Sequence, residues 1–161
     1  MGHPPEQIGG ADERMDTDPK TEPVSNFLEG HKQVLLDYHF VSPQRDAQLQ
    51  ANFEKSGSIS DLGTFLHAHQ DTYSHSEQIA KGQYHHNTTA PDHTYTDPAK
   101  ADRMAMDTFN LLVGAKGRIT GNGNAKTDYK KIQGLVHDFN TTSNDKKKYK
   151  DLQGIQKIAR E

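Results

Sequence analysis

The sequence SISDLGTFLHAHQDTYSH, residues 58–75, decides the fold. Ser58 is a residue type that caps helix starts, because its hydroxyl can accept a hydrogen bond from a free backbone N–H. Apolar residues then recur at intervals of three and four, the period of a helix with one buried face. These residues are Ile59, Leu62, Phe65, Leu66 and Tyr73. The spacing predicts a helix that continues to about Ser76.

The same period recurs on both sides of this stretch, and no segment alternates between polar and apolar residues as a strand would. Further helices are predicted over residues 24–39, 43–54, 97–114, 128–140 and 145–159. The expected fold class is therefore all-α, a single compact bundle of about five to six helices. Eight apolar residues should be buried in the last two helices: Ile132, Leu135, Val136, Phe139, Tyr149, Leu152, Ile155 and Ile158.

Two segments lack helical periodicity. Residues 1–23 combine Pro and Gly with polar side chains, which predicts a flexible N-terminal linker. Residues 80–96 are rich in His, Asn, Thr and Pro and predict a long ordered loop. We expect residues 24–161 to form a helical metal-binding domain that ends in basic helices over 116–161.

Composition limits the function classes. The 161 residues are only 31% hydrophobic with a mean hydropathy of -0.97, so a metal could add stability that a small core lacks. The absence of Cys excludes disulfides, Cys-ligated zinc and a thiol nucleophile. No stretch approaches the roughly 20 apolar residues of a transmembrane helix, and residues 1–25 lack a signal-peptide core. A cytoplasmic location is one expectation.

Charge is distributed unevenly. Residues 116–161 contain eleven Lys or Arg and five Asp or Glu, whereas the rest of the chain contains eight and seventeen. A basic end on an acidic body could hold a phosphate-rich partner or an acidic protein. The alternative is an ordinary solvated helix surface.

His67, Asp71 and His75 follow one another at intervals of four, which places them on one ridge of the predicted helix, roughly 12 Å long. Imidazole and carboxylate groups are normal zinc ligands, although three on one ridge would strain a single-ion site. His86 and Asp92 of the loop could add ligands, and His31 could face this helix and complete the site. His39 is interpreted as a surface histidine. The competing interpretation is that the ridge is an exposed face with local ion pairs.

Residues 63–75, with their LH, QD and SH pairs, resemble the corresponding helix of the zinc-dependent phospholipase C family and the single-strand-specific zinc nucleases. Residues 91–112 resemble uncharacterised bacterial domains, some at the C-termini of Rhs-type polymorphic toxins. The resemblance implies an all-α hydrolase that uses Zn²⁺ or another divalent metal on phosphodiester bonds of a phospholipid or a nucleic acid. It implies Asp71 as the bridging or water-orienting carboxylate beside His67, both catalytic. It also implies a toxin or effector delivered by a specialised bacterial secretion system, with a cognate inhibitory (immunity) protein.

The sequence departs from that family in three features. The family's three-zinc cluster uses an N-terminal Trp, whereas this chain has no Trp. His75 follows Asp71 by four residues and not six, and no second His-x-x-x-Glu helix is evident. A one- or two-metal site is therefore expected. Two alternatives stay open: a non-enzymatic, metal-stabilised module that binds through its basic C-terminal helices, and a helical domain without metal.

Overall fold

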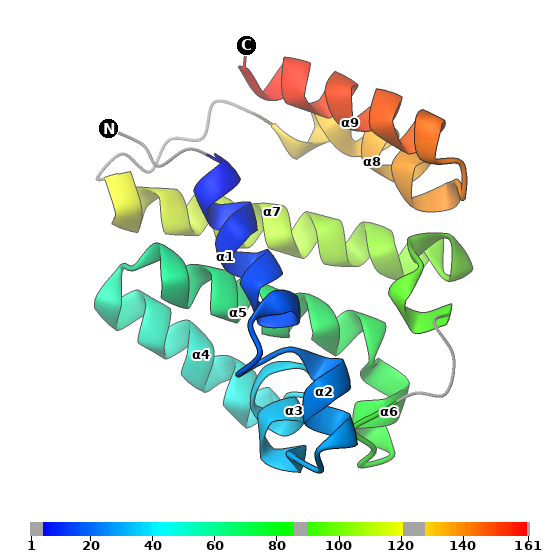
Figure 1. Cartoon of the computed structure of the whole chain (residues 1–161). Coiled ribbons are helices and arrows are strands. Elements are labelled where there is room, and N and C mark those ends of the chain that lie inside the picture. Colours follow the sequence, from blue (N-terminus) through cyan, green and yellow to red (C-terminus); the bar gives the residue numbers. More distant parts are fainter. Residues whose placement is uncertain (1–4, 86–89, 121–127, 161) are drawn as a thin grey trace. The chain divides into compact units, whose positions relative to one another are not determined.

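The structure is a computed structural model that describes residues 5–85, 90–120 and 128–160 (Figure 1). Within these residues it contains nine α-helices, two short 3-10 helices and no strand. This confirms the all-α class. The expected number of five to six helices was too low, although seven of the nine have seven residues or more.

The chain divides into two compact units, Met1–Asn87 with Arg118–Gly121 and Thr88–Gly117 with Asn122–Glu161. In the first unit the helices are α1 (Pro5–Thr17), α2 (Pro23–Leu28), α3 (Lys32–Tyr38), α4 (Pro43–Ser56), α5 (Ile59–Ser74) and α6 (Ser76–Ala80). The later elements are η1 (Ala90–Asp92), η2 (Thr94–Thr96), α7 (Pro98–Thr120), α8 (Tyr129–Thr141) and α9 (Asp145–Arg160).

α4 and α5 form as the sequence predicts. The Ser42 and Ser58 side chains accept hydrogen bonds from Arg45 N and Asp61 N, which caps both helix starts. Gly57, with φ of 64°, ends α4 in the left-handed conformation that glycine adopts without strain. Leu62, Phe65, Leu66 and Ala68 of α5 are buried, so this helix lies at the centre of its unit.

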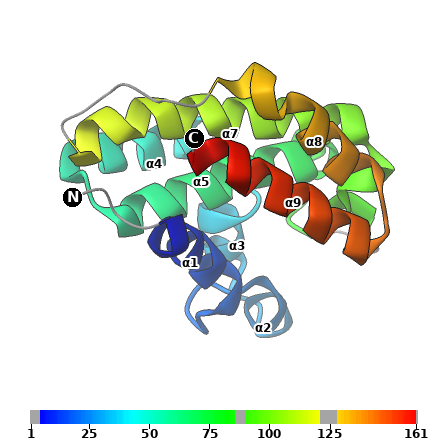
Figure 2. The ribbon, with the colours of Figure 1, turned by 90° about the horizontal axis from the view of Figure 1, so that it is seen from above.

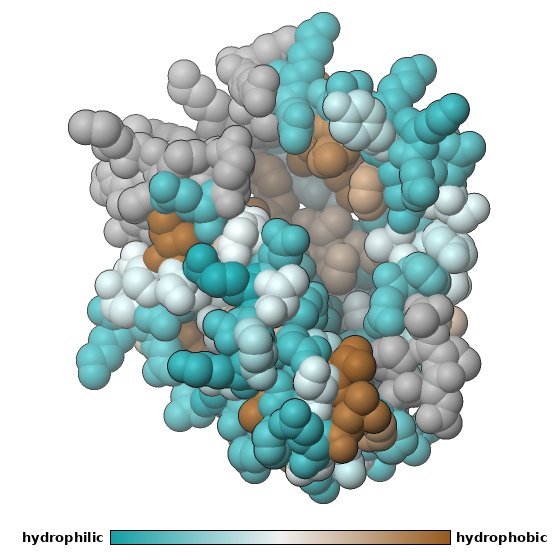
Figure 3. All heavy atoms as spheres, viewed as in Figure 1, coloured by the Kyte–Doolittle hydropathy of each residue, from teal (hydrophilic) through white to brown (hydrophobic). Residues whose placement is uncertain are grey.

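The predicted helix over 24–39 is two helices. Gly30 has a φ of 75°, which ends α2 and redirects the chain into α3. α2 exposes its apolar residues Val24, Phe27 and Leu28, and a hydrophobic patch lies over it in Figure 3. Sequence periodicity correctly indicated helical structure here but did not predict the break at Gly30.

Helix α1 occupies most of the segment for which the sequence predicted a linker. Ala11 and Met15 are 2% and 6% exposed, and Figure 2 shows α1 and α3 beside α5. α1 packs very closely on α5, because a Cβ added to Gly63 would lie 2.4 Å from the Ala11 Cβ. The lack of a side chain at Gly63 therefore allows the close approach of α1 to α5.

The second unit also differs from the prediction in detail. α7 continues past Gly114, where the sequence predicted its end, to Thr120. α8 and α9 form at the predicted places, but Tyr149 and Leu152 of α9 are 64% and 41% exposed and not buried. The predicted loop over 80–96 contains η1 and η2, and its residues 86–89 lie outside the described part. Among the described residues, no helix is both long and apolar enough to cross a membrane.

We predict that Gly63→Ala destabilises the protein by about 1–3 kcal/mol, because the added methyl group forces α1 away from α5. Urea unfolding followed by circular dichroism would measure the loss. Gly9→Ala in α1 is the matched control: its Cβ would meet nothing within 4 Å, so it should be neutral or stabilising. Equal stability of the two variants would contradict the close α1–α5 contact.

Candidate metal centre

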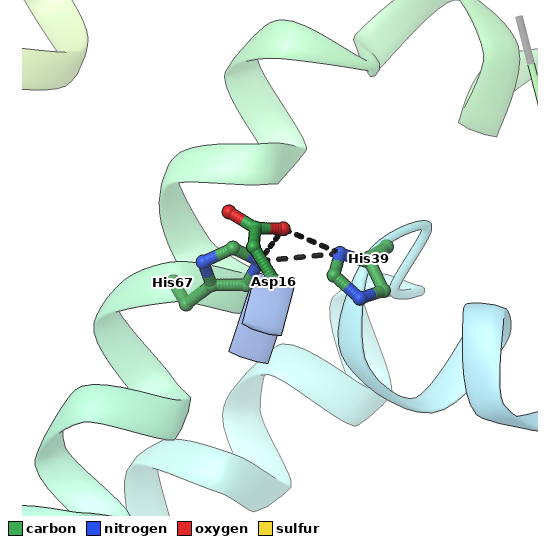
Figure 4. A group of neighbouring side chains, drawn as sticks. All are labelled: Asp16, His39 and His67. Atoms are coloured by element: carbon green, nitrogen blue, oxygen red, sulfur yellow. Dashed lines mark hydrogen bonds and ion pairs between the residues drawn. The ribbon is translucent and has the colours of Figure 1, made fainter. Parts of the chain in front are cut away.

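Three side chains from separate segments of the first unit converge on one point (Figure 4). Asp16 comes from the last turn of α1, His39 from the residue after α3, and His67 from the middle of α5. One ligand atom from each lies within 4.8 Å of the other two. Both histidines are buried, at 2% and 7% exposure, whereas the Asp16 side chain is 55% exposed. The group therefore has one side open to solvent.

The orientation of His39 is fixed by the backbone. Its Nε2 lies 2.8 Å from the carbonyl oxygen of Thr21, in the turn between α1 and α2. A carbonyl can only accept, so Nε2 must carry the proton. In neutral His39 the lone pair is then on Nδ1, which faces the group, as a metal ligand requires.

His67 is oriented by a second carboxylate. Its Nδ1 lies 3.5 Å from Oδ1 of Asp12, one helical turn before Asp16 in α1, while its Nε2 faces the group. When the ring is neutral and its proton lies on Nδ1, toward Asp12, the lone pair on Nε2 faces the group. This carboxylate–histidine arrangement is common behind metal-ligating histidines, because it fixes the tautomer and increases the ring's basicity.

A fourth potential ligand atom, a carboxylate oxygen, lies beside the same point. Asp71 Oδ2 is 3.2 Å from His39 Nδ1 and 3.4 Å from His67 Nε2. Its other oxygen, Oδ1, lies 3.7 Å from Nε2 of His75, whose ring stacks on Phe40. Asp71 thus links the three-residue group to His75.

The spacing of these atoms fits a small tetrahedral cation. Ligand distances of about 2.0–2.1 Å around zinc place neighbouring ligand atoms about 3.3 Å apart. The two facing histidine nitrogens are 3.1 Å apart, and Asp16 Oδ1 lies 3.6 Å from His67 Nε2 and 3.8 Å from His39 Nδ1. These distances are within about 0.5 Å of the separation expected around zinc, so only small side-chain movements would be needed to bind the ion.

Electrostatics in the group favour positive charge. Burial alone would lower the pKa of His67, but the neighbouring carboxylates of Asp12, Asp71 and Asp16 raise it to about 10. Burial alone would raise the pKa of Asp71, but His39 and His67 lower it to about 2. Partial burial raises the pKa of Asp16. The carboxylates thus create a potential that a proton or a metal cation can neutralise.

The structure places the residues of the predicted site in several locations. His67 and Asp71 meet as the helix ridge implied, and His75 contacts the outer oxygen of Asp71. His31 is exposed and lies beside Asn26 and Glu29, so it is not part of the group. Asp92 is an exposed residue of η1 in the second unit, and His86 lies outside the described residues.

Asp16 was not among the predicted ligands, and His39 is buried and not a surface histidine as predicted. Asp16 was missed because its segment was interpreted as a linker. A signal was available: Ile8, Ala11 and Met15 have helical spacing, and Asp12 and Asp16 form a second ridge beside them. No local sequence pattern indicates that His39 is buried, because its position depends on how the chain turns after α3.

No protein family, no curated protein and no solved structure matches this chain. The interpretation of the centre therefore depends on its own geometry.

We predict that the wild-type protein binds about one Zn²⁺ per chain and that His39→Ala and His67→Ala each weaken binding by more than 100-fold, because each removes a ligand. Competition titration with a chromophoric chelator would measure the affinities. His31→Ala is the matched control, since His31 is outside the group. Equal losses in all three variants would contradict the assignment.

Asp12→Asn should weaken zinc binding by about 10–100-fold while preserving one ion per chain. The reason is that Asp12 orients the His67 ring from its Nδ1 side and is not itself one of the ligands. The same titration measures this effect. Glu13→Gln, an exposed neighbour on α1, removes an equal charge without touching His67. An unchanged affinity in Asp12→Asn would show that Asp12 does not support the ring.

Proposed function

We propose that the chain is a divalent-metal protein, with zinc as the expected ion, and that its centre hydrolyses phosphodiester bonds. The observation that carries the metal assignment is the meeting of ligand atoms: His39 Nδ1, His67 Nε2 and Asp16 Oδ1 face one point, with Asp71 Oδ2 beside the two nitrogens. A cation that displaces the proton held in this group would find all of these atoms oriented toward it.

The solvent-exposed side of the group supports catalysis. Asp16 is half exposed, whereas the two histidines and Asp71 form the inner wall. Zinc at this point would lower the pKa of a bound water and polarise a phosphoryl oxygen. In this proposal Asp71 orients that water, since its Oδ2 faces the centre and its Oδ1 faces His75.

The substrate class in this proposal follows from the helix motif. Residues 63–75 resemble zinc phosphodiesterases in sequence, and the contact between His67 and Asp71 supports the use of that ridge. A phospholipid and a nucleic acid both offer the required bond. Toxin activity, secretion and a cognate immunity protein are further parts of this proposal that depend on the resemblance alone.

A structural metal site is the second candidate, and the position of Asp71 favours it. If Asp71 Oδ2 joined Asp16, His39 and His67, four protein ligands would close the coordination shell, as in structural zinc sites. The ion would then stabilise the fold without binding water. The basic C-terminal helices would be the part that contacts a partner.

Replacement of zinc by cobalt distinguishes the two candidates. We predict that azide changes the visible spectrum of the Co²⁺ protein, because an open coordination position accepts the anion. In parallel, bis(p-nitrophenyl) phosphate serves as a phosphodiester probe, with chelated protein and Asp71→Asn as comparisons. Metal-dependent hydrolysis that falls at least 100-fold in Asp71→Asn supports the enzyme.

Two outcomes would contradict the hydrolase. A Co²⁺ spectrum insensitive to azide, together with a large loss of thermal stability on chelation, would assign the ion a structural role. Hydrolysis that persists at full rate in His67→Ala would show that activity comes from elsewhere. His31→Ala again controls for changes unrelated to the centre.

A further inference from the structure

Helix α2 presents its apolar face to solvent. Val24, Phe27 and Leu28 are 66%, 43% and 77% exposed, and their spacing of three and four residues puts them on one side of the helix. Figure 3 shows a hydrophobic patch over α2, the helix that carries them. Single exposed apolar residues are common, but three on a six-residue helix form a patch that calls for an explanation. We call Val24, Phe27 and Leu28 the α2 patch.

The inner face of α2 is polar. Its buried residue is Asn26, 3% exposed, whose side-chain amide donates hydrogen bonds to the carbonyl oxygens of Pro19 and Glu22. The Glu22 carboxylate caps the helix start by accepting from the backbone N–H groups of Val24 and Ser25. This is the reverse of a surface helix that buries its apolar side. The hydrogen bonds hold α2 so that its apolar side faces outward.

Amphipathic side chains adjoin the α2 patch. The ring of Phe27 lies 5.3 Å from that of His85 and 6.5 Å from that of Tyr84. The ammonium group of Lys32 lies 4.7 Å from the centre of the Tyr84 ring. Aromatic rings with polar ends and long cationic side chains are the types that occupy the boundary between lipid tails and water.

We propose that the α2 patch docks the protein on the surface of a phospholipid bilayer. Its size favours this occupant over a protein. Three partly exposed side chains offer about 300 Å² of apolar area, whereas a stable protein interface needs about 800 Å² from each partner. Insertion of a few apolar side chains between lipid headgroups needs no matching partner surface. Figure 2 shows α2 at an outer edge of its unit, where a flat surface can reach it.

This docking surface is independent of the metal ion, since none of its residues belongs to the centre. The two are nevertheless close in the chain: Thr21, whose carbonyl oxygen holds His39, immediately precedes the Glu22 cap of α2. A docked α2 patch would therefore bring the turn that supports His39 near the lipid headgroups.

The chain contains no Trp, so the fluorescence of a single introduced Trp comes from that position alone and can report on its contact with lipid. We predict that Leu28→Trp emission shifts to the blue when full-length protein meets vesicles of phosphatidylcholine, with or without phosphatidylglycerol. Tyr149→Trp, a comparably exposed position on α9, should not shift. In co-sedimentation, the double variant Val24→Ser/Leu28→Ser should bind about tenfold more weakly than wild type, with unchanged helicity.

Three results would overturn the proposal. One is Leu28→Trp emission that stays constant with both vesicle types. Another is a shift of Tyr149→Trp alone on phosphatidylglycerol vesicles, which would assign lipid attraction to basic α9. The third is equal vesicle binding by wild type and the serine double variant. Zinc content measured on the same samples shows separately whether the metal centre is intact.

Discussion

The approach of α1 to α5 at Gly63 is the constraint on which the candidate centre depends. No side chain separates the helices there, so Ala11 packs directly against the α5 backbone. One residue after Ala11, Asp12 reaches Nδ1 of His67, and one turn later Asp16 reaches Nε2. The small residue Gly63 of α5 thus lets α1 place one carboxylate beside each ring nitrogen of His67.

The buried polar groups of the centre form hydrogen bonds and ion pairs with one another, since little water reaches them. The His39 and His67 rings lie edge to face, with centres 5.0 Å apart, and contact carboxylates from two helices and one backbone carbonyl. Removing one partner would leave the others buried without compensation. The cluster therefore combines two properties: it demands a defined arrangement of α1, α3 and α5, and it offers a cation several oriented ligands.

Local patterns in the sequence predicted much of the fold. Ser58 marked a helix start because its side chain caps free backbone N–H groups, and the His67–Asp71 contact followed from a spacing of four. Features that depend on tertiary contacts were missed. The docking of α1 depends on Gly63, about fifty residues away, and the burial of His39 depends on the turn at Thr21. The apolar spacing of α2 was correct, but period alone does not tell which way a face points.

The ligand set also has a consequence for the unfolded chain. Asp16, His39 and His67 belong to segments far apart in sequence, and the two histidines are 28 positions apart. A cation bound to all three would act as a reversible cross-link that closes two successive loops. Such closure reduces the entropy of the unfolded ensemble, as disulfides do in small secreted domains. In a chain without cysteine, metal availability would then decide how firmly the N-terminal helix is retained.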